Sequence, residues 1–125
     1  MRSTARLALG VACAAGLVGA CQSERPRPAP PVLNIVLDRT LVHSPDTLKG
    51  TLRAQDPDGI DSVWLAVDSS PRAGEDGLLQ TAFESRFRSL VRAGHGPGDR
   101  IAVILEARDV TGFRSRLDTS ATVVP

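Results

Sequence analysis

Four aspartates have the side chains best suited to binding a metal ion. Asp56, Asp58 and Asp61 lie close together in the chain, and Asp109 lies in a later segment. Calcium takes about six to eight oxygen ligands, mostly from carboxylates and carbonyls. Aspartate also caps turns by accepting hydrogen bonds from nearby backbone amides, and the acid spacing of an EF-hand loop is missing here. The sequence therefore favours turn capping over calcium binding, and it predicts no metal site and no cofactor.

The two histidines, His43 and His95, are the side chains best suited to acid–base catalysis. A general base needs a partner within hydrogen-bond distance, and neither histidine lies in a motif that supplies one. Ser44 follows His43, but adjacency in sequence does not make a catalytic triad. The glycine-rich run 94–98 lacks the lysine and the hydroxyl of a phosphate-binding loop. We expect no catalytic residue, because an enzyme would require one of these histidines to meet carboxylates in a cleft.

Trp64, the only tryptophan, is the first candidate binding residue. It alternates with Val63, Leu65 and Val67, as in a strand whose two faces differ. If the three apolar residues face the core, Trp64 points outward and is free to stack on a ligand. The opposite register buries it, and the sequence leaves both registers open.

Arg86 and Arg88 are the other candidate binding residues. On a strand, residues two apart point to the same face, and a basic patch of this kind suits an anionic envelope polymer. The arginines that could extend the patch are Arg92, Arg114 and Arg116. The interspersed acids Glu84 and Asp118 favour a simpler interpretation, in which these arginines are solvated strand faces.

The N-terminus has the layout of an export signal. Arg2 and Arg6 precede an apolar stretch over residues 7–18, which is short of the roughly 20 residues that span a membrane. The small residues Gly19 and Ala20 follow, as a signal peptidase requires. Cleavage is expected between Ala20 and Cys21.

The sequence Val18-Gly19-Ala20-Cys21 resembles the lipobox of bacterial lipoproteins. The resemblance implies that the Cys21 thiol receives a diacylglycerol and that the new amino group is acylated after cleavage. Two or more acyl chains give stable membrane residence, whereas one gives only marginal binding. The resemblance thus implies a cell-envelope protein, lipid-anchored to a membrane and facing the periplasm or the surface. The alternative is plain secretion, since Val18 and Ala20 also fit simple cleavage after Ala20.

The chain divides into three parts. Residues 1–20 are the predicted lipoprotein signal peptide, and residues 21–31 are a proline-rich tether that favours an extended polyproline conformation. Residues 32–125 are predicted to form one domain, a length that supports a single core. The 15 basic and 14 acidic side chains of the full chain nearly cancel, which leaves no basic field to hold nucleic acid.

The elements that must position these residues are short strands. Runs of alternating apolar and polar residues are separated by turn-forming residues at roughly regular spacing. Residues 78–91 fit either this alternation or one face of a helix, and the strands on both sides favour a strand. Each run has one apolar face that needs a second sheet to cover it. The sequence therefore predicts an all-β fold, a sandwich of about seven strands.

Three short sequence motifs lie at the turns between the predicted strands, at residues 54–63, 98–101 and 107–112. With the strand spacing, they make residues 32–125 resemble the bacterial immunoglobulin-like (Ig-like) domains. The resemblance implies an Ig-like β-sandwich that is not an enzyme and makes protein–protein or structural contacts in the envelope. The alternative is a module that binds carbohydrate or an envelope polymer, for which an exposed Trp64 beside arginines would be the site. The partners expected are thus a membrane, through lipid on Cys21, and an envelope protein or polysaccharide.

Overall fold

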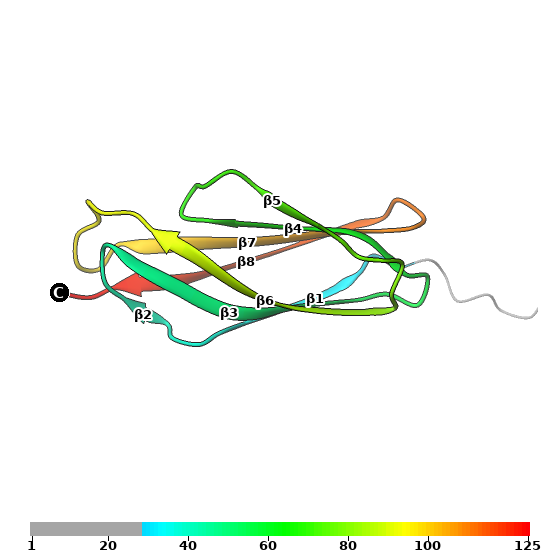
Figure 1. The fold of residues 1–125 in the computed structure, drawn as a ribbon, viewed down its shortest axis with the longest axis horizontal. Coiled ribbons are helices and arrows are strands. Elements are labelled where there is room, and N and C mark those ends of the chain that lie inside the picture. The colour runs from blue at the N-terminus through cyan, green and yellow to red at the C-terminus, as the bar shows by residue number, and fades with distance from the viewer. Residues whose placement is uncertain (1–28) are drawn as a thin grey trace, which may run out of the picture.

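The computed structural model describes residues 29–125, and every regular element in them is a strand (Figure 1). The predicted signal peptide, Ala20, Cys21 and most of the tether lie outside the described residues. The strands are β1 (Val32–Leu37), β2 (Leu41–Val42), β3 (Asp46–Gln55), β4 (Ile60–Val67), β5 (Ala73–Asp76), β6 (Ala82–Val91), β7 (Arg100–Asp109) and β8 (Arg114–Val123). The predicted all-β class is confirmed.

The strands form two sheets that pack face to face. The three-stranded sheet has the antiparallel order β1-β3-β6. The five-stranded sheet has the order β2-β8-β7-β4-β5, in which only the short β2 runs parallel to its neighbour. This is the predicted Ig-like sandwich, with eight strands among the described residues in place of about seven. The short β2 and the fully exposed β5 show no apolar alternation in their sequences.

Alternation along each strand produces the core between the sheets. On β7, Ile101, Val103, Leu105 and Ala107 are fully buried, and the residues between them face away from the three-stranded sheet. On β3, Leu48, Leu52 and Ala54 supply the opposing layer. Burial of one face on each strand removes apolar area from water, which is the main term favouring this fold.

Residues 82–91 form a strand, so the helical alternative for residues 78–91 is excluded. β6 pairs with β3 along its whole length, from Gln55↔Ala82 to Asp46↔Val91. A helical face would have buried Leu79 and Leu90, yet each is 65% exposed. Leu79 instead lies in the turn before β6, with a positive φ of 57°.

The two ends of the sandwich carry different groups of loops (Figure 1). The N-terminal end holds the start of β1, the turn after β3 and the β7–β8 hairpin, and a hydrogen bond from the Val110 amide to the Gly59 carbonyl (3.0 Å) joins the last two. The C-terminal end holds the β4–β5 and β6–β7 loops and the end of the chain. The candidate sites below lie at these two ends, on one side of the sandwich and on the outer sheet face.

Candidate functional site

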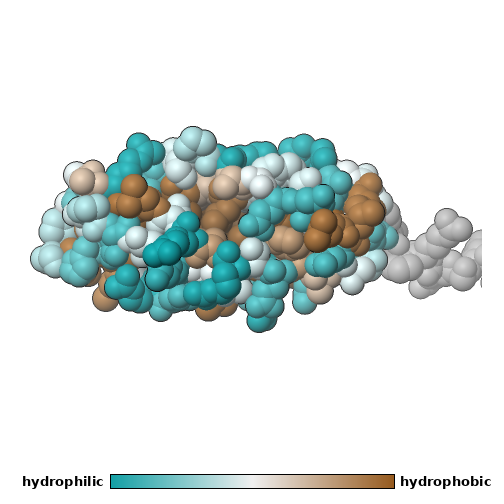
Figure 2. Space-filling model, viewed as in Figure 1, coloured by the Kyte–Doolittle hydropathy of each residue, from teal (hydrophilic) through white to brown (hydrophobic). Residues whose placement is uncertain are grey.

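The side of the sandwich between β5 and β6 is open and forms a cleft of about 300 Å³. Within residues 29–125, both strands are the last of their sheets on this side, so each has one backbone edge without a strand partner. Figure 2 shows apolar side chains (brown) between polar ones in the middle of this face. The apolar residues that line the cleft are Leu52, Val63, Leu65, Val67, Pro71, Ala73 and Phe87, and the acidic Glu75 also lines it. An apolar floor beside two free strand edges is suited to an extended peptide segment.

Arg86 and Arg88, predicted as binding residues, both line this cleft. Arg86 is already engaged: its guanidinium donates to both carboxylate oxygens of Asp38 (2.7 and 2.9 Å) and to Thr51 Oγ1 (2.9 Å). The hydrogen bond from Arg86 holds the pKa of Asp38 below its ordinary value. Arg88 makes no ion pair within residues 29–125, and its cross-strand neighbour is Lys49, another cation. Of Arg86 and Arg88, therefore, Arg88 is the residue whose charge is available to a ligand.

Trp64 lies on the outer face of the five-stranded sheet, which settles its register as outward. Its cross-strand neighbour on β5 is Gly74, where an added Cβ would lie 3.0 Å from indole Cδ1. The indole therefore lies over β5, in space that a side chain at position 74 would occupy. Three guanidinium groups lie near the ring centroid, from Arg72 (4.7 Å), Arg114 (5.6 Å) and Arg108 (5.8 Å). Trp64 is half-buried as a result.

The arginines around Trp64 are not the ones expected there. Arg86 and Arg88 belong to the other sheet, and of the wider predicted set only Arg114 lies near the ring. Arg72 and Arg108 are also neutralised, by Glu106 (2.9 Å) and Asp61 (2.5 Å). Alternation places Arg108 and Arg114 on outer strand faces, but only the pairing of β4 with β5 and β7 brings these strands together.

Two of the four aspartates, Asp56 and Asp109, cap turns as predicted. Asp56 Oδ1 accepts a hydrogen bond from the Asp58 amide (2.8 Å). Asp109 Oδ1 accepts three, from Thr111 N (2.9 Å), Thr111 Oγ1 (2.7 Å) and Phe113 N (2.9 Å). Asp61 does not join this group, since its carboxylate is paired with Arg108 on the outer sheet face.

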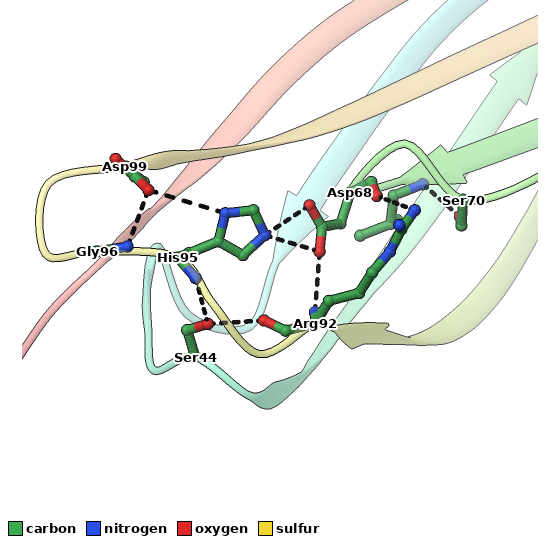
Figure 3. Close-up of polar contacts among 8 residues, drawn as sticks. Ser44, Asp68, Ser70, Arg92, His95, Gly96 and Asp99 are labelled. Atoms are coloured by element: carbon green, nitrogen blue, oxygen red, sulfur yellow. Dashed lines mark hydrogen bonds and ion pairs between the residues drawn. The ribbon is translucent and has the colours of Figure 1, made fainter.

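His95 meets two carboxylates at the C-terminal end of the sandwich (Figure 3). Its Nε2 lies 2.9 and 3.0 Å from the two oxygens of Asp68, and its Nδ1 lies 3.9 Å from Asp99 Oδ2. The Ser44 hydroxyl donates to the Arg92 carbonyl (2.6 Å) and accepts from the His95 amide (3.1 Å), so it is bonded to backbone and not to the imidazole. This arrangement ties three loops together and lacks the serine–imidazole contact that activates a nucleophile.

His43, the other histidine, is not part of that network. Its amide donates to Asp46 Oδ2 (2.9 Å), which caps the start of β3. Neither histidine lines the β5–β6 cleft. The described residues therefore do not place a histidine, a carboxylate and a free nucleophile in one concave site.

Replacement of Asp68 by alanine should lower the free energy of unfolding by about 1–3 kcal/mol, because it leaves the partly buried Arg92 amide without an acceptor. Burial by itself raises the pKa of Asp68, but hydrogen bonds from the Arg92 amide and the His95 ring outweigh it, and the pKa is lower than the ordinary 3.8. A lowered pKa means that the contribution is present above about pH 3.8 and is lost as the pH falls through the folded-state value.

Urea unfolding near neutral pH and near pH 3 measures this difference. The loss caused by Asp68→Ala should be larger near neutral pH than near pH 3. The control is Asp118→Ala, because both side chains of the Arg116–Asp118 pair are more than half exposed and exposed pairs contribute little. An equal loss at both pH values would contradict the assigned role of the Asp68 carboxylate.

No helix within residues 29–125 has the length and hydropathy needed to cross a membrane. Neither a protein-family model nor a curated protein sequence matches this chain. Among solved structures, the chain is similar to the PKD domain of an M14-like peptidase from the Thermoplasmatales archaeon SCGC AB-540-F20, with a TM-score of 0.57 and 17% identity. The match covers 78% of this chain and 99% of that one. At this identity the likeness shows the fold alone, and that fold is an Ig-like β-sandwich.

Proposed function

We propose that this chain is a cell-envelope lipoprotein that uses its Ig-like domain to contact another envelope protein. The N-terminal part of the proposal rests on Val18-Gly19-Ala20-Cys21 and the proline-rich segment that follows. A lipid on Cys21 would hold the chain at a membrane, and the extended tether would space the domain from it. The domain then presents its side cleft and its C-terminal end to neighbours.

The observation that carries the contact role is the β5–β6 cleft. An extended partner segment can pair with the free edge of β6 and place alternate side chains over the apolar floor. Arg88 lies on the outer face of β6 at the rim of the cleft, and nothing in residues 29–125 neutralises its charge by an ion pair. The favoured partner is therefore a segment with apolar side chains and a carboxylate near Arg88.

Photochemical cross-linking in the native cell tests this role. A photoreactive phenylalanine derivative in place of Arg88 should yield one discrete protein adduct. The same derivative at Arg100, exposed on the outer face of β7, should not. Phe87→Ala, which removes part of the cleft floor, should reduce the adduct several-fold. Equal adducts from positions 88 and 100 would contradict a specific role for the cleft.

A second candidate function, binding of an anionic or neutral envelope polysaccharide, is favoured by the surroundings of Trp64. The ring is partly exposed beside a shallow depression of about 470 Å³ that Asp61, Asp76 and Arg108 help to line. Aromatic faces with polar groups at their edges suit a sugar ring. Two results together would favour this alternative over protein contact. They are a change in Trp64 fluorescence on adding purified envelope polysaccharide and the absence of an adduct at position 88.

A further inference from the structure

Three aspartates from two different turns meet at the N-terminal end of the sandwich. Asp56 follows β3 of the three-stranded sheet, and Asp109 ends β7 of the five-stranded sheet. One carboxylate oxygen each from Asp56, Asp58 and Asp109 lies within 4.8 Å of the other two. The hydrogen bond from Val110 to Gly59 holds the two turns at this distance.

Two of these carboxylates are buried with one oxygen unsatisfied. Asp56 is 2% exposed and Asp109 is 1% exposed. Their Oδ1 atoms cap the two turns, but Asp56 Oδ2 and Asp109 Oδ2 accept no hydrogen bond. A buried charged oxygen without a partner is strongly destabilising. Turn capping therefore accounts for the Oδ1 atom of each carboxylate, and the two Oδ2 atoms have no hydrogen-bond partner.

No basic side chain of residues 29–125 forms an ion pair with this cluster. Arg108, next to Asp109 in sequence, points to the outer sheet face and pairs with Asp61. Burial raises the pKa of Asp56, and the adjacent Asp109 adds to that increase. Burial also tends to raise the pKa of Asp109, but hydrogen bonds from Thr111 and Phe113 outweigh it and hold the pKa low. The pair therefore carries negative charge that needs either a proton or a cation.

We propose that Asp56, Asp58 and Asp109 bind a calcium ion that joins the two sheets at the N-terminal end of the sandwich. Calcium–oxygen distances of about 2.3–2.6 Å allow two ligand oxygens to lie up to about 5 Å apart, which accommodates this cluster. Asp58 is exposed, so water can complete the shell from the solvent side. With three carboxylates, the expected dissociation constant is about 10⁻⁴–10⁻³ M, as in extracellular calcium modules.

This inference revises the sequence-based expectation of a metal-free domain and is independent of the β5–β6 cleft. The site lies at the end where the chain enters β1, and the Ser115 hydroxyl holds the Pro31 carbonyl there (2.5 Å). An ion in this position would link the turn after β3 to the hairpin after β7. Calcium would then stabilise the sandwich where the tether joins it.

Thermal unfolding of the full chain in detergent micelles, followed by circular dichroism, tests the proposal. Millimolar calcium should raise Tm by roughly 4–8 °C relative to EDTA, which corresponds to about 1 kcal/mol for a domain of this size. Magnesium should act more weakly, because it demands a smaller octahedral shell. Calcium should also shift the amide resonances of Asp58, Gly59 and Val110 in nuclear magnetic resonance spectra.

Three variants separate calcium binding from general effects of charge. Asp58→Asn removes one negative charge beside Asp56, so it should not lower Tm in EDTA, and it should reduce the calcium-induced rise at least twofold. Asp109→Asn keeps a side-chain oxygen to cap the hairpin and should abolish the rise. Asp61→Asn is the matched control, because Asp61 lies near Asp58 in sequence but is paired with Arg108, and it should retain the full response.

Two results would overturn the proposal. In the first, sodium chloride at matched ionic strength raises Tm as much as calcium does, which is charge screening. In the second, calcium has no effect, while Asp56→Asn raises Tm in EDTA and removes the gain in stability on acidification. That result would show that Asp56 and Asp109 share a proton and do not bind a cation.

Discussion

Replacement of Leu105 by alanine should lower the free energy of unfolding by about 2–5 kcal/mol. Leu105 is 0% exposed and lies on β7, between β4 and β8 in the five-stranded sheet. Its cross-strand neighbours are Leu65 and Leu117, and it packs in the cluster that contains Leu52 and Phe83. Sheet pairing on both sides restricts how far the surrounding residues can move into the space left by the side chain. The loss of stability therefore includes the cost of a cavity as well as the lost burial of apolar area.

Domains of this size have a total stability of about 5–15 kcal/mol, so the loss is a large part of the whole. At about 4–8 °C per kcal/mol, Tm should fall by roughly 8–40 °C. Urea unfolding and thermal circular dichroism measure both quantities. Leu90→Ala is the matched control, because Leu90 is 65% exposed on β6, and its effect should stay within about 0.5 kcal/mol.

The Leu90 control also tests the secondary structure of residues 82–91. In a helix that buries Leu79, Phe83, Phe87 and Leu90 together, Leu90→Ala would be as damaging as a core substitution. On β6, Leu90 lies on the outer face of the sheet, and Phe87 on the inner face packs against both core clusters. A loss at Leu90 that equals the loss at Leu105 would contradict the assigned register.

Cys21→Ser should abolish acylation of the chain and its cleavage before residue 21. The proposed modification forms a thioether at the Cys21 sulfur, and serine lacks the thiolate that acts as the nucleophile. Two or more acyl chains hold a protein stably in a bilayer, so nearly all of the wild-type chain should enter the membrane fraction. The serine variant should remain as an uncut, unacylated precursor.

Intact-mass measurement of the purified protein decides this prediction. The wild-type mass should correspond to a chain that begins at Cys21 with the added acyl groups. Cys13→Ser is the matched control, since it makes the same atom change inside the predicted apolar stretch and should leave acylation intact. A soluble wild-type chain that begins at an unmodified Cys21 would contradict the lipoprotein proposal and favour plain secretion.

The position of residues 29–31 gives the proposed anchor a geometric consequence. Residues 29–31 enter the sandwich at the N-terminal end, beside the Asp56 turn and the β7–β8 hairpin (Figure 1). A tether over residues 21–31 in a polyproline conformation would span about 30 Å, at roughly 3.1 Å per residue. The proposed calcium site would then face the membrane, and the β5–β6 cleft would face sideways, where neighbouring proteins can reach it.

The sequence by itself determined the class of fold and which residues of β3 and β7 face the core. Alternation has a period of two along a strand, so the buried Leu48, Leu52, Ile101 and Leu105 are readable from local pattern alone. Turn residues are equally local, because Asp56 and Asp109 cap amides only two to four positions away. The direction of the Trp64 side chain could not be predicted, because both faces of its strand carry apolar residues.

Tertiary structure alone decided which of these local features meet. The two capping turns come together only because β3 and β7 belong to opposite sheets that end at the same place, which leaves two carboxylate oxygens facing each other without partners. The hydrogen bond between Asp38 and Arg86 also depends on tertiary structure, because it joins residues 48 positions apart. It occupies Arg86 and leaves Arg88 free. Such contacts depend on the packing of distant segments, and no local periodicity encodes that packing. The pattern of the chain therefore predicts the sandwich, and its candidate sites appear only when the two sheets are packed together.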